Sequence, residues 1–235
     1  MKKKIENLYR RYYPVQTDNF RDCILRYLRK GNIIVDAGCG NGSQYKYDLK
    51  NIAKEIIGVD TCDDLGQNEN VTIHLKDNLE NIPLLDGSVD IIISRYVFEH
   101  IKEPEKILKE FKRILKSGGK IIFFTPNRFN YVYLISSITP QKFHLWINKI
   151  RSGGTMTEKD TFPTYYRLNS GRAIRNNALK IGLRVEEIIF FEPEPAYLVF
   201  SSLLFRLGVF YERVVNQVSA FNFLRGIIVG VLVKA

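Results

Sequence analysis

Five short apolar runs recur between residues 33 and 124, and they constrain the fold of this chain more than any other feature. Each is three to five residues long, is built mainly from isoleucine, valine and phenylalanine, and is separated from the next run by a longer, more polar stretch. Such continuous branched runs are typical of parallel strands that are buried on both faces. We therefore expect an α/β domain with right-handed crossovers. The expected strands are 33–35, 55–59, 71–75, 89–93 and 121–124.

Two helices are expected between these strands. The first should run from about Ser43 to Ala53. The second should begin at Pro104, since the first turn of a helix tolerates proline, and the Gly118–Gly119 pair should stop it. Its apolar residues share one face, and lysines and glutamates occupy the other. The apolar residues are Ile107, Leu108, Phe111, Ile114 and Leu115.

The last third of the chain is less regular. Its expected elements are a helix over 171–181, a strand over 185–191, a long apolar helix over about 196–223 and a final strand over 226–233. The final strand can add antiparallel to its neighbour, which completes a doubly wound, mostly parallel sheet of seven strands. The expected segments are an N-terminal helical cap (1–30), a cofactor-binding core (31–127), an α-helical substrate cap (128–170) and a C-terminal part of the sheet (171–235).

The net charge of +10 is concentrated in two parts of the chain. Residues 1–30 carry +6 and residues 140–185 carry +7, whereas 31–139 carry −2 and 186–235 carry −1. Basic surfaces attract phosphate groups, nucleic acid or anionic membranes. The same charges can also serve only to keep a protein soluble.

The cysteines indicate the compartment. Cys23, Cys39 and Cys62 have no metal-ligand spacing and make no even disulfide set, so we expect no metal and a reduced, cytoplasmic setting. The basic start has no apolar run behind it, unlike a signal peptide. No segment reaches the roughly 18 uninterrupted apolar residues that span a bilayer.

A glycine-rich turn follows the first expected strand. It reads Val35-Asp36-Ala37-Gly38-Cys39-Gly40-Asn41-Gly42, and its glycines allow a sharp turn and a close approach of the backbone to a ligand. Open α/β sheets bind cofactors at this carboxyl end of a strand. A dinucleotide fingerprint would have a third glycine at Ser43, which disfavours a nicotinamide oxidoreductase. Carboxylates at strand ends, Asp36 and Asp60, suit the free diol of a neutral nucleoside.

Residues 36–42 resemble the first motif, D-x-G-C-G-x-G, of class I S-adenosylmethionine-dependent methyltransferases of the small-molecule, type 11-like branch. Asp60 ends the second strand, Asp77 to Pro83 matches the family's stretch after the third, and Leu115 to Gly119 resembles its lead into the fifth. The resemblance implies a Rossmann-like methyltransferase fold, S-adenosyl-L-methionine as cofactor and S-adenosyl-L-homocysteine as product. It implies cofactor-binding roles for Asp36, Gly38, Cys39, Gly40, Gly42, Asp60, Thr61, Asp77, Asn78, Leu79, Ser94 and Tyr96.

The acceptor is less constrained than the cofactor. Methyl transfer depends mostly on positioning, but an oxygen nucleophile usually also needs a general base. The candidates are His100, His144 and the tyrosines Tyr165 and Tyr166. His100 can equally be a packing residue, His144 is more often a surface or packing histidine, and we expect a structural role for His74. The chain lacks the Asn-Pro-Pro-Tyr signature of methyltransferases that act on amino groups of nucleic acid or glutamine, so we expect a small-molecule, lipid-linked or saccharide-linked acceptor and no nucleic acid. The expected acceptor-binding residues are Arg95, Arg128, Tyr165 and Tyr166.

Three further interpretations stay open. The apolar stretch 197–207 either packs under the edge of the sheet or meets lipid, so a membrane surface is a candidate partner. The basic flanks also suit an RNA methyltransferase, although no RNA-binding module is recognisable. A non-catalytic subunit that kept the fold is the third interpretation, and the intact glycines and acids argue against it.

Overall fold

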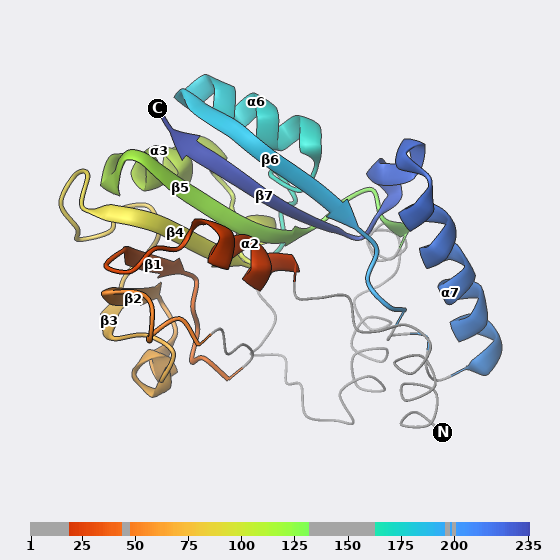
Figure 1. Ribbon diagram of the computed structural model, residues 1–235, viewed down its shortest axis with the longest axis horizontal. Coiled ribbons are helices and arrows are strands. Elements are labelled where there is room, and N and C mark those ends of the chain that lie inside the picture. The colour runs from red at the N-terminus through yellow and green to blue at the C-terminus, as the bar shows by residue number, and fades with distance from the viewer. Residues whose placement is uncertain (1–18, 44–47, 132–162, 196–197, 199–200) are drawn as a thin grey trace. The chain divides into compact units, whose positions relative to one another are not determined.

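A seven-stranded sheet organises the chain (Figure 1). The computed structural model describes residues 19–43, 48–131, 163–195, 198 and 201–235. The strand order β3-β2-β1-β4-β5-β7-β6 confirms the predicted α/β fold. The strands are β1 (Ile33–Ala37), β2 (Glu55–Asp60), β3 (Ile73–Lys76), β4 (Val89–Arg95), β5 (Leu115–Pro126), β6 (Leu183–Phe191) and β7 (Ile227–Lys234).

The first five strands are parallel to their neighbours. β1 pairs with β2 and β4, β2 also pairs with β3, and β4 also pairs with β5. In this register Ala37 lies opposite Val59, and Arg95 lies opposite Phe124. Because parallel strands end at the same edge, the polar residues that follow β1, β2, β4 and β5 are brought to one edge of the sheet.

The last two strands of the chain, β6 and β7, run in opposite directions to each other. β7 lies between β5 and β6, and Figure 1 shows its arrow running against that of β6. Residues 227–233 are all buried, as the continuous apolar run requires. The antiparallel terminal strand predicted from the sequence is thus confirmed.

The helices begin and end at recognisable signals. Pro104 is the first residue of α3, and Ser170 caps α6, where its hydroxyl accepts from the Ala173 N–H at 3.2 Å. Gly182 ends α6 in the left-handed conformation that C-terminal glycines favour. The helices are α2 (Asn19–Tyr27), α3 (Pro104–Ile114), α6 (Gly171–Ile181) and α7 (Ser202–Gln217), and the short 3₁₀ turns are η1 (Asp63–Gln67), η2 (Phe98–His100) and η5 (Ser219–Leu224).

Adjacent phenylalanines of β5 serve opposite faces of the sheet. Successive side chains of a strand point to opposite faces. Phe124 meets Phe20 of α2 edge-on at a centroid distance of 5.8 Å, whereas Phe123 stacks on Phe98 at 4.6 Å. Figure 1 accordingly shows α2 in front of the sheet and α3 behind it. Helix α3 also contacts α6, where Lys112 donates to the Ile181 carbonyl at 2.7 Å.

Three predicted elements, near the glycine turn, α3 and β3, need correction. The described part of the expected helix, residues 48–53, forms turns, because Asp48 adopts the left-handed conformation with φ of 50°. Helix α3 ends at Ile114 rather than near Gly118, because residues 115–120 already belong to β5 and pair irregularly with β4. The third strand is also displaced, since β3 covers 73–76 instead of 71–75.

The chain separates into two compact units. One comprises residues 18–126, 164–189 and 228–235, and the other comprises 1–17, 127–163 and 190–227. The long helix expected over about 196–223 is two elements, α7 and then η5. Most of the expected substrate cap, residues 132–162, lies outside the described part of the chain, and the domain boundaries stay a prediction.

Candidate functional site

The glycine loop after β1 is shaped by left-handed backbone conformations. Gly38, Gly40 and Gly42 have φ of 76°, 53° and 73°. A Cβ at Gly38 would lie 2.3 Å from Val97 Cγ2, and one at Gly42 would lie 2.2 Å from Asn68 Oδ1. At Gly40 no atom lies within 4 Å of that position. The loop is therefore tightly packed at its two ends and open at its centre.

Asp60 connects the ends of β1 and β2. Its Oδ2 accepts from the Gly40 N–H at 2.8 Å, and its Oδ1 accepts from the Cys62 N–H at 2.9 Å. A carboxylate oxygen has two lone pairs, so both oxygens retain an acceptor site. Asp60 thus orders the loop and still offers hydrogen-bond acceptors beside it, and Thr61 follows it as an exposed residue.

Two asparagines hold the other side of the loop. The buried Asn68 donates from Nδ2 to the carbonyls of Cys39 and Gly40 at 3.2 and 3.1 Å, and Asn70 donates to the Gly42 carbonyl at 3.0 Å. His74 Nε2 lies 2.9 Å from the Asn68 carbonyl, in keeping with a structural role. No sequence motif marks the stretch before β3, so neither asparagine was predicted.

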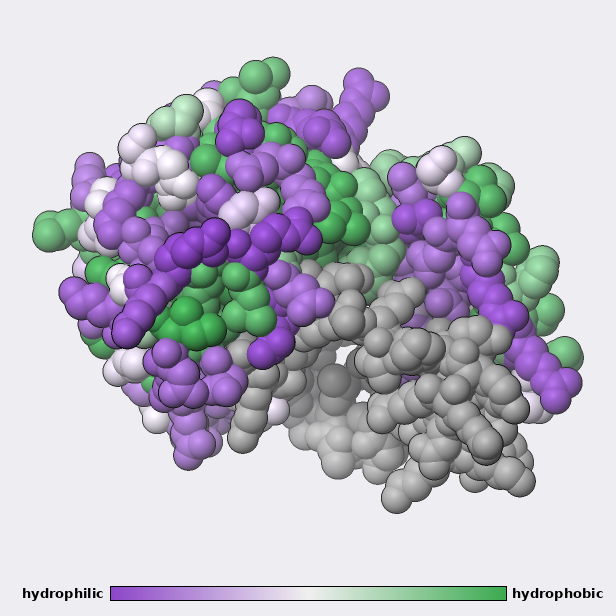
Figure 2. Space-filling view, in the orientation of Figure 1, coloured by the Kyte–Doolittle hydropathy of each residue, from purple (hydrophilic) through white to green (hydrophobic). Residues whose placement is uncertain are grey.

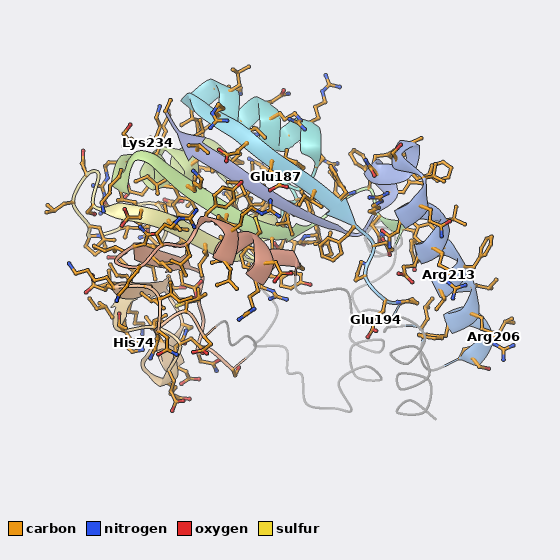
Figure 3. All side chains as sticks on the ribbon, viewed as in Figure 1. His74, Glu187, Glu194, Arg206, Arg213 and Lys234 are labelled. Carbon is orange, nitrogen blue, oxygen red and sulfur yellow. The ribbon has the colours of Figure 1, made fainter. Side chains whose placement is uncertain are left out.

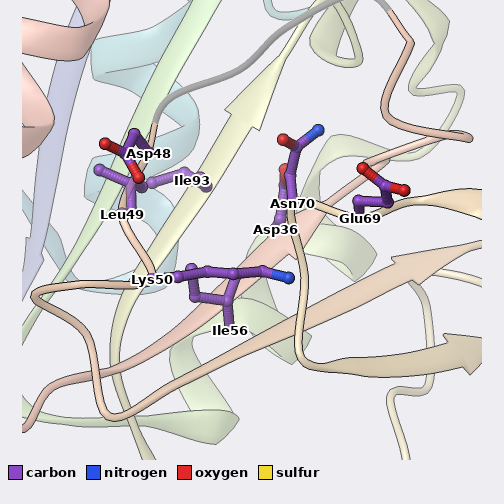
Figure 4. Close-up of a pocket in the computed structure, with 8 residues that line it drawn as sticks. All are labelled: Asp36, Asp48, Leu49, Lys50, Ile56, Glu69, Asn70 and Ile93. Carbon is purple, nitrogen blue, oxygen red and sulfur yellow. The ribbon is translucent and has the colours of Figure 1, made fainter.

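Asp36 ends up in an unfavourable environment for a charge. Burial raises the pKa of its carboxyl to about 7, and repulsion from Asp60 adds to this shift. Asp36 also lines a cavity of about 250 Å³ together with Lys50 and Asn70 (Figure 4). Of the described lining residues, only Asp36 belongs to the 36–42 motif, so the cavity adjoins the glycine loop on one side.

The loop after β3 is anchored from α3. Asp77 Oδ1 accepts from the Asn78 N–H at 2.8 Å, and Asn78 Oδ1 accepts from the Glu80 N–H at 2.9 Å. Further along, the Ile82 N–H donates to Glu110 Oε1 at 2.6 Å. These bonds fix the expected cofactor-contacting stretch, in which Asp77 and Leu79 are half-buried.

Arg95, at the end of β4, is packed among aromatic rings. Its guanidinium lies 4.7 Å from the centroid of Phe124 and 5.9 Å from those of Phe20 and Tyr96. Tyr96 has a φ of 57° and donates its N–H to the Phe124 carbonyl at 2.9 Å. The rings hold a positive charge at the edge where β4 and β5 end.

Glu99 is a functional candidate that no sequence motif marks. It is buried, and its Oε2 accepts from the Thr125 hydroxyl at 3.1 Å. Thr125 in turn accepts from Asn169 Nδ2 at 2.7 Å. Burial raises the pKa of Glu99 to about 7. The three residues, which we call the Glu99 network, join the ends of β4 and β5 to the start of α6.

The predicted acceptor-side residues are brought together only in part. The N–H groups of Tyr165 and Tyr166 donate to the Glu99 carbonyl at 2.7 and 3.2 Å, and burial with the charge of Glu99 raises the pKa of the Tyr166 hydroxyl. His100 is half-buried beside Glu99 in η2. Arg128, whose guanidinium lies 5.5 Å from the Phe129 ring, belongs to the other unit. His144 lies outside the described residues.

Comparisons with known proteins agree with this geometry. Residues 35–123 match the family model described as a methyltransferase domain. A probable S-adenosylmethionine-dependent methyltransferase of Mycolicibacterium smegmatis is 31% identical over 112 residues, which cover 43% of this chain and 40% of the relative. The malonyl-[acyl-carrier protein] O-methyltransferase of Yersinia pestis is 32% identical over 99 residues, which cover 40% and 37%. The chain thus spans about two fifths of the length of these relatives.

A solved structure shows the same fold over most of the chain. The geranyl diphosphate C-methyltransferase of Streptomyces coelicolor A3(2), in complex with S-adenosyl-L-homocysteine, superposes with a TM-score of 0.56 at 15% identity. The match covers 92% of this chain and 79% of that one. With the family model, these findings confirm the predicted resemblance to methyltransferases and the predicted fold.

Proposed function

We propose that this chain, whose residues 35–123 form a class I S-adenosylmethionine-dependent methyltransferase domain, transfers a methyl group to an oxygen of a small-molecule, lipid-linked or saccharide-linked acceptor. The observation that carries the proposal is the bond from the Gly40 N–H to Asp60 at 2.8 Å. It places a carboxylate with spare acceptor sites beside an open glycine loop, at the edge of the sheet where such folds bind ligands.

The residues of this edge fit S-adenosylmethionine. Asp60 can accept from ribose hydroxyls, and the open space at Gly40 admits a ligand close to the backbone. The buried Ser94 hydroxyl has no hydrogen-bond partner among the described residues, so a bound ligand can supply one. The remaining cofactor contacts of this proposal come from Asp36, Gly38, Cys39, Gly42, Thr61, Asp77, Asn78, Leu79 and Tyr96. When bound, the cofactor supplies an electrophilic methyl group on a sulfonium.

The Glu99 network is suited to take up the acceptor proton. An acceptor hydroxyl that gains the methyl group must lose its proton, and a carboxylate with a pKa near 7 is an efficient base at neutral pH. Thr125, which is itself bonded by Asn169, orients the carboxylate of Glu99. The charge of Glu99 also contributes to the raised pKa of the Tyr166 hydroxyl. His100, next to Glu99 in the chain, is the alternative base. Arg95 and Tyr165 complete the acceptor side of the proposal, and Arg128 and His144 stay predictions from the sequence.

Titration calorimetry with S-adenosyl-L-homocysteine tests the proposal. We expect saturable binding by the wild type and at least about 100-fold weaker binding by Asp60→Ala, since charge-assisted hydrogen bonds are lost. Asp60→Asn should fall between the two. Asp64→Ala, an exposed aspartate of η1, is the matched control and should bind like the wild type.

The outcomes separate the alternatives. Absence of binding by folded wild-type protein would overturn the proposal and favour a non-catalytic subunit. If binding occurs, labelled S-adenosylmethionine should label anionic glycolipids or phenolic compounds, and salt-sensitive labelling of RNA alone would overturn the proposed acceptor class. The cytoplasm is the compartment we propose for the reaction, because the three cysteines are free thiols.

A further inference from the structure

Helix α7 has two faces with different surroundings. Its buried residues Gly208, Glu212 and Val215 are spaced so that they share one face. A Cβ at Gly208 would lie 2.7 Å from Pro195 Cβ and 2.8 Å from Leu198 Cδ1, so these side chains cover that face closely. One face of α7 is therefore packed within its own unit.

The C-terminal turn of α7 is held as well. Arg225 donates from Nε to the Val215 carbonyl at 2.7 Å and from Nη2 to the Asn216 carbonyl at 3.0 Å. The Tyr211 hydroxyl donates to the Leu224 carbonyl of η5 at 2.9 Å. The guanidinium satisfies carbonyls that a helix end leaves without partners. These bonds set which face of α7 points outward.

The outward face is a stripe of large apolar side chains. Leu203, Leu207 and Phe210 are 66%, 56% and 68% exposed, and their spacing of four and three residues aligns them along the helix. Single exposed leucines are ordinary, but an aligned stripe of large apolar side chains is typical of a surface that binds a protein or a membrane. Figure 2 shows hydrophobic and hydrophilic residues side by side along this helix.

Two arginines lie on the same outward face. Arg206 and Arg213 follow Leu203 and Phe210 by three residues each, both are exposed, and Figure 3 labels them on α7. The one acidic residue of the helix, Glu212, is on the packed face. The outward face thus combines leucine, phenylalanine and arginine without an acid, a composition typical of helices that lie in a membrane interface.

The charge of the whole unit supports an anionic partner. Residues 1–17, 127–163 and 190–227 hold thirteen Lys and Arg against six Asp and Glu, a net charge of +7 out of +10 for the chain. Anionic lipid surfaces attract such basic segments over about a Debye length. Of the helices that the structure describes, none is long and apolar enough to cross a membrane.

We propose that the outward face of α7, formed by Leu203, Arg206, Leu207, Phe210 and Arg213, binds the surface of an anionic phospholipid bilayer. The helix lies in the plane of the interface, with its apolar stripe among the acyl chains and its arginines at the phosphates. This inference does not rest on the proposed methyl transfer. If both hold, the chain is positioned at a surface where a lipid-linked acceptor would be presented.

Vesicle co-sedimentation at low salt tests the inference, using the full chain without cofactor. Wild-type protein should pellet with equimolar phosphatidylglycerol and phosphatidylcholine and should bind much more weakly to phosphatidylcholine alone. Leu207→Glu combined with Phe210→Glu should lower the partition coefficient at least tenfold. Arg206→Ala with Arg213→Ala should lower the partition coefficient about 25-fold on anionic vesicles only, at about fivefold for each basic residue.

A matched control comes from the other unit. Leu179 of α6 is 79% exposed, so Leu179→Glu introduces one glutamate at an exposed leucine outside α7 in the sequence and should leave vesicle binding unchanged. Far-ultraviolet circular dichroism and binding of S-adenosyl-L-homocysteine verify that each variant is folded. Wild-type protein that stays in the supernatant would overturn the inference. Equal vesicle binding by the wild type and both α7 variants would also overturn it, by placing the membrane contact elsewhere.

Discussion

The glycine loop and the Glu99 network lie at the same edge of the sheet but are built differently. Around the loop, backbone groups do the bonding: the Gly40 N–H donates to Asp60, and the carbonyls of Cys39 and Gly40 accept from Asn68. Around Glu99, side chains bond to side chains, with Asn169 donating to Thr125 and Thr125 to Glu99. The glycine loop therefore depends on backbone conformation, whereas the Glu99 network depends on contacts between side chains that are distant in the sequence.

The two halves also share one electrostatic feature. Asp36 beside the loop and Glu99 in the network both have a pKa raised to about 7, because burial disfavours their charged forms. Asp36 has an additional cause, the repulsion from Asp60. Ionisation should therefore affect ligand binding at the loop and folding stability at both places.

The largest effect should come from a side chain in the glycine loop. A Cβ at residue 42 would collide with Asn68 Oδ1. Gly42→Ala should therefore weaken S-adenosyl-L-homocysteine binding by about 100-fold and lower the free energy of unfolding by about 2 kcal/mol. Gly118→Ala is the control, because Gly118 shares the left-handed φ, at 75°, but has no atom within 4 Å of a Cβ. Similar binding by both variants would show that packing against Asn68 does not shape the site.

A smaller effect should appear in the pH dependence of stability. The pKa of Glu99 is raised on folding, from 4.5 to about 7, so the folded protein holds a proton that the unfolded chain releases. The cofactor-free protein should therefore be most stable near pH 5 and lose stability as the pH rises through 7. Glu99→Gln should remove about 2 kcal/mol of this change.

Urea unfolding at several pH values measures the effect of Glu99. Exposed Glu103→Gln is the matched control and should keep the wild-type pH dependence. Burial also raises the pKa values of Asp36 and Glu192 to about 7. These two residues should account for the dependence of the unfolding free energy on pH that remains in Glu99→Gln. An unchanged pH dependence of the stability in Glu99→Gln would contradict a pKa raised by burial at this position.

The smallest effect should distinguish the two carboxyls by ligand binding. A ligand with positive charge, such as a sulfonium, favours the ionised form of Asp36, so S-adenosylmethionine should bind about tenfold more weakly at pH 6 than at pH 8. Asp36→Asn should abolish this pH dependence, whereas Glu99→Gln should retain it. Calorimetric titrations across the pH range would measure both, and the reverse pattern would place the cofactor at the Glu99 half.

Much of the fold could be predicted from residues that act locally. The bounds of α6 follow from a capping serine and a terminal glycine, and the buried strands follow from continuous apolar runs. The expected helix after the glycine loop could not be judged this way, since the left-handed conformation of Asp48 breaks the pattern over 48–53. The predicted end of α3 was also wrong, because Leu115 already pairs with Val89 of β4, three residues before the local stop signal at Gly118.

The sequence by itself determined the glycine-loop half of the proposed site, because a glycine loop between a buried strand and an acid at the end of the next strand works through the backbone. Only the tertiary structure revealed the Glu99 network, since Glu99, Thr125 and Asn169 are 26 and 44 residues apart and no local pattern links them. The outward face of α7 was decided in the same way. Its apolar and basic residues are plain in the sequence, but packing at Gly208 and capping by Arg225 select which of them face outward.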